Sequence, residues 1–254
     1  MEKRMHAGRA AEAGVRMSQL AARGFTAPPT ALDGRFGLLE VISGKSARPE
    51  LLSLDLGNRW AVEHVYVKVY PCCAWIQSAV QQLVALRGPQ PLKPQEIKKV
   101  RIGVSAYAAE QNGNVAPPDT MGAQFSIPYC AALALTADPG DPAMFTPEAI
   151  NEPSRRELAQ RVELVVDPEM EAAYPKHYGA RVELELANGE RRVSAGLDPH
   201  GMPADPCTEA EQLDKFTRLA SHVKSSVTVA EIIRKVRISE RLSSIHELTG
   251  LLRN

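Results

Sequence analysis

The sequence predicts an α+β fold, with helical segments at both ends of the chain and a mixture of strands and helices between them. Apolar residues recur at helical spacing near both ends, whereas the middle alternates apolar and polar residues as half-buried strands do. Asn188-Gly189 stands between two alternating segments and is a strong hairpin signal. We therefore expect a largely antiparallel sheet in a protein of the α+β class.

The opening segment, residues 1–58, is predicted to be helical. Residues 3–23 place small and apolar side chains on one face, and Gly24 follows as a helix stop signal. A Pro-Pro pair then opens a second helical stretch, which is predicted to reach Ile42. The small residues of the first helix imply that it packs closely against another helix.

The middle segment, residues 59–206, is predicted to hold the sheet. Helices are expected over residues 74–87 and 121–136, the second despite Pro128 inside it. A stretch rich in proline and glycine, residues 198–206, marks the end of this part. The segments with period-two alternation, each predicted to be a strand, are 62–69, 98–107, 161–166, 180–186 and 190–194.

The closing segment, residues 207–254, returns to helices. Thr208 with Glu211, and later Thr228 with Glu231, have the spacing of a capping box in front of an apolar helical run. These helices and the opening helix each need a buried partner and are expected to pack on each other. Together they make a thin domain, which favours further helices ahead of the first residue.

Composition and charge are those of an ordinary globular protein. The chain has 254 residues, of which 44% are hydrophobic and 24% are charged. Lysine and arginine total 30 and aspartate and glutamate total 30, a balance that argues against a nucleic-acid partner. No apolar run approaches the length of a membrane-spanning helix, so a membrane partner is not expected either.

The four cysteines do not form a recognisable framework. They are Cys72, Cys73, Cys130 and Cys207, and no pair has the spacing of a Cys-x-x-Cys motif. This pattern argues against disulfides and against a zinc site, and it favours reduced thiols in a cytoplasmic protein.

Four segments, in this order along the chain, resemble motifs of the MmgE/PrpD family, which contains 2-methylcitrate dehydratases and cis-aconitate decarboxylases. Four ordered matches are far more specific than any one of them. Two positions depart mildly from the family pattern, Met5 in place of leucine and Asp205 in place of asparagine. The segments are KRMHAGRAA at 3–11 with GFT at 24–26 and LDGRFG at 32–37, KVYPCC at 68–73, FSIPYCA at 125–131, and GMPADPCT at 201–208.

The resemblance implies an all-helical domain built from residues 1–58 and 207–254. It also implies that a smaller α+β domain, residues 59–206, is inserted between them and closes over the active site. A cytosolic or mitochondrial-matrix setting, a homodimer, and a reaction without metal or organic cofactor are further implications. Family members are longer and carry an N-terminal helical region with additional active-site residues.

The resemblance also implies which side chains meet the substrate, a di- or tricarboxylate. It assigns Lys3 to carboxylate binding, His6 to carboxylate binding or proton transfer, and Lys68 to a second carboxylate as a binding and catalytic residue. Tyr129 would donate a proton or a hydrogen bond to the reacting part of the substrate. From spacing alone, the two lysines and His6 would be solvated side chains, and Tyr129 would be a core tyrosine.

Two functions follow as alternatives. The first is a lyase or isomerase that dehydrates, decarboxylates or epimerises a small polycarboxylate. The second is a truncated or non-catalytic half-protein that must pair with a separate N-terminal helical partner. The second alternative predicts exposed apolar surface on the helical part.

Overall fold

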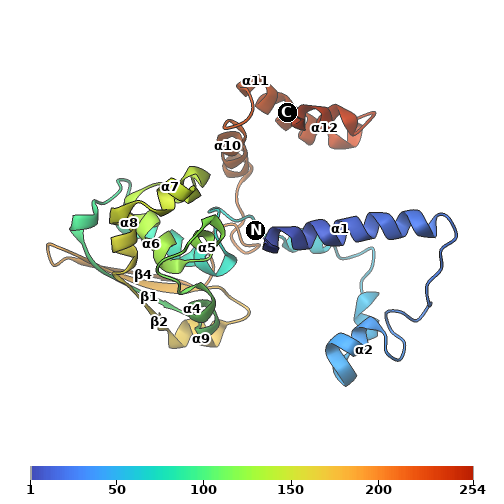
Figure 1. Cartoon of the computed structure of the whole chain (residues 1–254), viewed down its shortest axis with the longest axis horizontal. Helices are drawn as coiled ribbons and strands as arrows, with labels where there is room; N and C mark the ends of the chain where they lie inside the picture. Colours follow the sequence, from blue (N-terminus) through green and yellow to red (C-terminus); the bar gives the residue numbers. More distant parts are fainter. Residues whose placement is uncertain (1, 254) are drawn as a thin grey trace. The chain divides into compact units, whose positions relative to one another are not determined.

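The computed structural model describes residues 2–253, and within them it leaves the side chains of residues 2–4 and 45 undescribed. The chain divides into two units, Met1–Glu63 and His64–Asn254 (Figure 1). Each unit is described by itself.

The first unit is helical, and the side chains that the structure describes in it form no hydrophobic core. Helix α1 (Glu2–Ala21) is followed by Gly24 at φ +91°, as the stop signal predicted. The second predicted helix forms only as α2 (Leu38–Ser43), because the chain turns before it and Phe36 adopts a positive φ of 66°. Among the side chains that the structure describes in this unit, none that is hydrophobic is buried. Three 3-10 segments complete it: Gly44–Ser46, Pro49–Leu52 and Ala61–His64, whose last residue opens the second unit.

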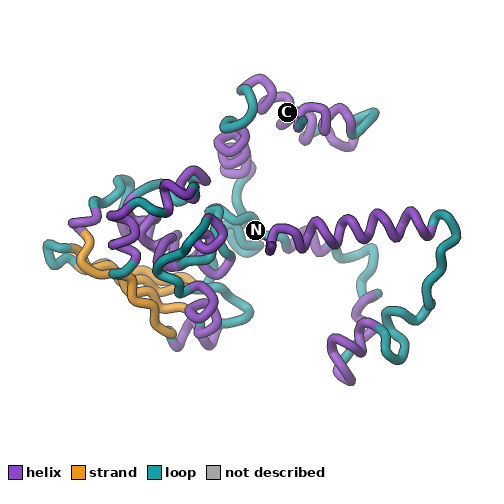
Figure 2. The backbone as a smooth tube through the Cα atoms, viewed as in Figure 1, coloured by secondary structure: helices purple, strands orange, loops and turns teal. Residues whose placement is uncertain are grey.

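The second unit contains a four-stranded mixed sheet, drawn in orange in Figure 2, which confirms the α+β class. Its spatial order is β2-β1-β3-β4, with β1 parallel to β2 and antiparallel to β3, and β3 antiparallel to β4. Asn188-Gly189 makes the predicted tight turn between β3 and β4, with Gly189 at φ +89°. The strands are β1 (Ile97–Val104), β2 (Val162–Val166), β3 (Ala180–Leu186) and β4 (Arg191–Gly196).

One face of this sheet is covered by helices, and the core lies between them. Helix α3 (Gln77–Arg87) packs on β3 and β4, while α6 (Ile127–Thr136) packs on α3, on β2 and on α8 (Pro153–Ala159). The alternating residues of β3 explain this arrangement, since Val182 and Leu184 are buried and the charged residues between them are not. The core therefore lies between two layers, one of helices and one of strands.

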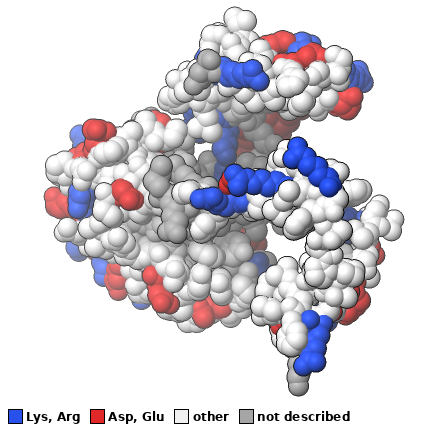
Figure 3. All heavy atoms as spheres, turned by 45° about the vertical axis from the view of Figure 1, so that its right-hand side comes forward, with Lys and Arg blue, Asp and Glu red and all other residues white. Residues whose placement is uncertain are grey.

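Shorter helices surround this core, and a helical tail follows the sheet. Among the described residues, no helix combines the length and the apolar character that crossing a membrane requires. On the face drawn in Figure 3, lysines, arginines and carboxylates form small groups of both signs. The remaining elements are Ala74–Ile76 and Pro94–Glu96 (3-10), α4 (Ala106–Asn112), α5 (Thr120–Gln124), Pro142–Phe145 (3-10), α7 (Pro147–Ile150), α9 (Pro168–Ala173), α10 (Glu209–Ala220), α11 (Ser226–Arg237), Ser239–Arg241 (3-10) and α12 (His246–Leu252).

Two further predicted elements differ from the structure. The strand predicted over residues 62–69 is wrong: the segment begins in a 3-10 turn, and the amide of Val67 donates to the carbonyl of Gly201 in a loop, not to a neighbouring strand. The single helix predicted over residues 121–136 is two helices. Ser126 separates them and caps α6, so that Pro128 lies in the first turn, where a missing N–H costs nothing.

Of the two predicted capping boxes, one is present in the structure and the other is not. The Thr208–Glu211 box is present in full at the start of α10. The second box is wrong, because α11 begins earlier and its N-cap is Ser225, whose hydroxyl accepts from the amide of Thr228. A serine three residues ahead therefore takes the role that the pattern gave to Thr228.

Candidate functional site

Three of the four motif segments belong to the second unit, and hydrogen bonds bring them together there. The amide of Cys73 donates to the carbonyl of Gln124, 2.8 Å away, which joins the Pro-Cys-Cys segment to the turn in front of α6. Cys72 and Cys130 of the same two segments are both buried, and the Cys72 thiol is close enough to add to the effect of burial in raising the pKa of Cys130. The motifs at 68–73 and 125–131 are thus neighbours in space although more than fifty residues separate them in the chain.

A buried glutamine fixes the backbone of the Lys68–Cys73 segment. Gln77, at the start of α3, accepts from the amide of Tyr70 at 3.0 Å and donates to the carbonyl of the same residue at 2.8 Å. Its amide group also lies 3.2 Å from the carbonyl of Cys72. Because Gln77 is 1% exposed, these bonds are shielded from water and hold the segment in one conformation.

The motif segment at residues 201–208 meets the chain just ahead of Lys68, and the contact is made at Gly201. The carbonyl of Gly201 accepts from Val67 at 3.0 Å, and Gly201 itself has φ +93°. A Cβ atom at this position would lie 2.1 Å from the carbonyl oxygen of Val67. The close approach of the two backbones and the positive φ both require glycine, which explains this residue of the motif.

Lys68 therefore sits where two motif segments cross. Its carbonyl oxygen accepts from the ammonium of Lys215 on α10, at 2.5 Å, and its own side chain is exposed. Among the described residues no carboxylate pairs with the Lys68 ammonium, in contrast to Lys99, which is paired with Glu163. An exposed, unpaired cation on a well-fixed backbone is suited to binding a carboxylate of a ligand.

Cys73 and Cys130, from the two neighbouring motif segments, are not activated as nucleophiles. Burial raises the pKa of Cys73, and the amide of Trp75 and the charge of Lys68 only partly oppose this shift. Burial, followed by the thiol of Cys72, raises the pKa of Cys130 well above its ordinary value. A nucleophilic cysteine needs a lowered pKa, so these thiols pack the core.

Tyr129 lies on α6 as predicted, and its hydroxyl already has a partner. The phenol donates to the carbonyl of Met144 at 2.5 Å, and its ring lies 5.8 Å from that of Phe145. Burial raises the pKa of Tyr129, which keeps the phenol protonated near neutral pH. A catalytic role for this group requires that the hydroxyl leave the Met144 carbonyl.

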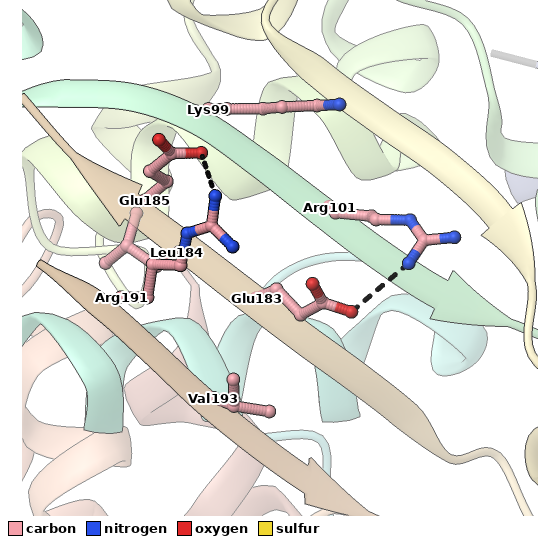
Figure 4. A pocket seen from close by; sticks show the side chains of 7 residues that line it. All are labelled: Lys99, Arg101, Glu183, Leu184, Glu185, Arg191 and Val193. Atoms are coloured by element: carbon pink, nitrogen blue, oxygen red, sulfur yellow. Dashed lines mark hydrogen bonds and ion pairs between the residues drawn. The ribbon is translucent and has the colours of Figure 1, made fainter. Parts of the chain in front are cut away.

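The hollow on the outer face of the sheet is a rival site, and its charges are already neutralised. Figure 4 shows Arg101 turned toward Glu183 and Arg191 turned toward Glu185 across β1, β3 and β4. The hollow has a volume of about 190 Å³. Each cation here faces a neighbouring carboxylate in an exposed ion pair, whereas Lys68 does not, so Lys68 is the better candidate for a carboxylate ligand.

The comparison with known proteins agrees with the motifs. Residues 70–240 match the MmgE/PrpD C-terminal domain. The chain belongs to the MmgE/PrpD family. It is 24% identical, over 99% of its length, to the cis-aconitate decarboxylase-like protein oryM of Aspergillus oryzae, of which the match covers 55%. It is 25% identical, again over 99% of its length, to a cis-aconitate decarboxylase of Aspergillus terreus, of which 54% is covered.

This MmgE/PrpD chain thus spans about half the length of the curated relatives it matches. The other two site residues that the resemblance implies lie in the first unit. His6 is an exposed residue of α1, and the side chain of Lys3 lies outside the described part of the chain. Lys68 and Tyr129 belong to the second unit, so the assignment of all four to one site stays a prediction.

Sequence reasoning missed a second group of polar residues near Lys68. A cavity of about 380 Å³ opens beside the crossing of Val67 and Gly201, and part of its wall comes from α10. Lys215 and Arg218 on that helix line it, together with His200 and Cys207 from the preceding loop. No motif of the MmgE/PrpD family pointed to the α10 residues, whose only signal in the sequence was ordinary helical spacing.

Proposed function

We propose that this chain forms part of an MmgE/PrpD lyase or isomerase that acts on a di- or tricarboxylate, and that Lys68 binds one of its carboxylates. The observation that carries this proposal is the exposed, unpaired ammonium of Lys68 at the crossing of two family motifs. The names of the relatives make decarboxylation of a cis-aconitate-like substrate the first reaction to test. Dehydration and epimerisation of hydroxy-polycarboxylates are the other members of the class.

Each of these reactions places negative charge on the carbon skeleton. In a decarboxylation the bond to the departing CO2 breaks, its electron pair stays on the substrate, and a proton must be supplied. In a dehydration or an epimerisation a base first removes a proton next to a carboxylate. A cation at a neighbouring carboxylate lowers the energy of the charged transition state in all three, which is the role we assign to Lys68.

Proton transfer is assigned to the two remaining groups that the motifs single out. Tyr129 has the protonation state of a donor, since burial raises its pKa. His6 is assigned to proton transfer or to carboxylate binding because it stands in the first family motif. Together with Lys3, His6 would bind the second carboxylate, and no metal or organic cofactor enters any of these steps.

A substrate screen tests the proposal. Purified protein is incubated with cis-aconitate and with a panel of hydroxy- and unsaturated polycarboxylates, and products are followed by NMR. Release of CO2 identifies a decarboxylase, a new double bond identifies a dehydratase, and exchange of a C–H proton for deuterium without net loss identifies an epimerase. The proposal fails if no polycarboxylate is converted by the protein either alone or with the N-terminal part of a relative added.

A second candidate function rests on the first unit. Its large apolar residues are exposed: Phe36 by 76%, Leu56 by 72% and Trp60 by 59%. Such a surface is typical of a protein face that another polypeptide covers. The chain would then be a non-catalytic half, and the occupant of the surface would be a separate helical partner or a second copy of this chain.

Dye binding and sedimentation separate the two candidates. A half-protein binds a hydrophobic dye strongly and self-associates as its concentration rises, and an added helical partner suppresses both effects. A monomer that does not bind the dye would rule this candidate out. Substrate turnover by the isolated chain would rule it out as well.

A further inference from the structure

A cluster of metal-binding side chains lies beside the cavity described above. One ring nitrogen of His200, the thiol of Cys207 and one carboxylate oxygen of Glu211 all lie within 4.8 Å of one another. We propose that His200, Cys207 and Glu211 bind a divalent transition-metal ion, of which Zn²⁺ is the best match. The proposal does not depend on the polycarboxylate chemistry, and its test does not use turnover.

The separations of the donor atoms fit this kind of ion. In a tetrahedral zinc site, bond lengths of about 2.0–2.3 Å place neighbouring ligand atoms roughly 3.3–3.8 Å apart. The Nε2 atom of His200 and the Oε1 atom of Glu211 are 3.1 Å apart. A contraction on the order of 1 Å at the thiol brings all three donors to bonding distance.

Hydrogen bonds hold His200 and Glu211 in place. The amide of His200 donates to the side chain of Gln81 at 2.7 Å, and the amide of Gly201 donates to the carbonyl of Asp205 at 2.8 Å, which closes the loop on itself. Glu211 uses only its Oε2 atom in the capping box with Thr208, at 2.7 Å from both the amide and the hydroxyl. The Oε1 atom of Glu211 therefore remains directed at His200.

The outer contacts of His200 have the arrangement that metal-binding histidines show. Its Nδ1 atom lies 2.9 Å from a carboxylate oxygen of Asp205, while the opposite nitrogen faces Glu211. A carboxylate on the far nitrogen orients the ring and raises its basicity toward the metal. Asp205 is thus a positioning residue, and it is one of the two departures from the family pattern noted in the sequence.

The donor types and the charges nearby select the metal class. Thiolate with imidazole and carboxylate favours zinc over magnesium or calcium, which prefer oxygen ligands alone. Metal binding requires the thiolate form of Cys207 and the neutral imidazole form of His200, so two anionic ligands and a neutral imidazole would face the ion. The cations lining the same cavity have other partners: Lys215 bonds the carbonyl of Lys68, and Arg218 pairs with Asp138.

Three protein ligands leave a fourth position, which opens on the cavity of about 380 Å³. A water molecule or an anionic ligand completes the coordination there. The ion would tie the loop after β4 to the start of α10. We therefore expect zinc also to raise the melting temperature of the protein.

Cobalt spectroscopy on the full chain tests the site. Chelator-treated protein is titrated with Co²⁺, and we expect one ion per chain with a near-ultraviolet thiolate-to-metal charge-transfer band. Cys207→Ser should abolish the band, His200→Gln should weaken binding at least tenfold, and Asp205→Asn should weaken it about 10- to 100-fold. His177→Gln is the matched control, because His177 is also paired with an aspartate, Asp198, at 2.6 Å.

An alkylation experiment on the unmodified chain keeps the test decisive if a variant fails to fold. Zn²⁺ should protect Cys207 from iodoacetamide, as read by peptide mass spectrometry, whereas Mg²⁺ should not. The proposal is overturned by a wild-type protein that binds no Co²⁺ at one saturable site. It is equally overturned by a charge-transfer band that survives in Cys207→Ser, or by a Cys207 that zinc does not protect.

Discussion

The replacement Tyr129→Phe separates the structural role of this residue from its proposed catalytic role. It removes the hydroxyl that donates to the Met144 carbonyl at 2.5 Å and keeps the ring that packs beside Phe145. Loss of one such bond, with its acceptor left partly buried, costs about 1–2 kcal/mol of unfolding free energy. If the phenol also delivers a proton to the substrate, turnover falls by about 100-fold or more, which corresponds to roughly 2.7 kcal/mol.

The two effects are measured separately, by urea denaturation and by turnover of the polycarboxylate that the screen identifies. Tyr107→Phe is the control, because Tyr107 is 41% exposed and its ring stacks on Tyr174 in the same unit without depending on the hydroxyl. A Tyr129→Phe protein that is as stable as wild type would refute the hydrogen bond to Met144. Turnover within about twofold of wild type would refute the proton-donor role and leave Tyr129 as a core residue.

Two further predictions concern stability. Gly201→Ala should lower the unfolding free energy by more than about 2 kcal/mol in urea denaturation, because it adds a backbone clash to the cost of φ +93°. The control Gly189→Ala, at φ +89° with open space around it, should cost only about 1 kcal/mol. Equal losses in the two variants would contradict the close approach of the two backbones at Gly201. For Asp167, burial acts to raise the pKa, but the amide of Met170 and the guanidinium of Arg181 outweigh it and lower the pKa below its usual value. Its stabilising effect is therefore complete above the unfolded pKa and is lost as pH falls through the lower folded pKa. Asp167→Asn should lower the unfolding free energy by roughly 1 kcal/mol near pH 7 and make it depend less on pH in the acid range. An unfolding free energy that falls with acid as steeply as in wild type would contradict this account.

Local signals predicted the elements that depend on few residues. The Asn188-Gly189 hairpin and the Thr208–Glu211 capping box formed as expected, since each is decided within four residues of chain. The strand predicted over residues 62–69 failed for the opposite reason. Its alternation was real, but the amide of Val67 donates to Gly201, in a loop that lies more than 130 residues further along the chain, and not to a neighbouring strand.

Only part of the candidate site could be predicted, because several of its contacts join residues that are distant in the chain. The motifs pointed to Lys68 and Tyr129, but no pattern in the sequence contained the contact between the Tyr129 hydroxyl and Met144. The grouping of His200 with Cys207 and Glu211 was also missed, because cysteine spacing alone argued against a zinc site. A loop that folds back at Gly201 and the first turn of α10 create this cluster, and neither has a metal-binding signature.

The most direct test of the proposed function concerns Lys68. The measurement is kcat/KM for the polycarboxylate that the screen identifies, compared between wild type, Lys68→Ala and the control Lys176→Ala, which removes another exposed lysine of the same unit. Loss of a cation that binds a substrate carboxylate should lower kcat/KM by at least tenfold, or about 1.4 kcal/mol, while the control stays near wild type. A Lys68→Ala protein within about twofold of wild type would contradict the assignment of Lys68 to the substrate.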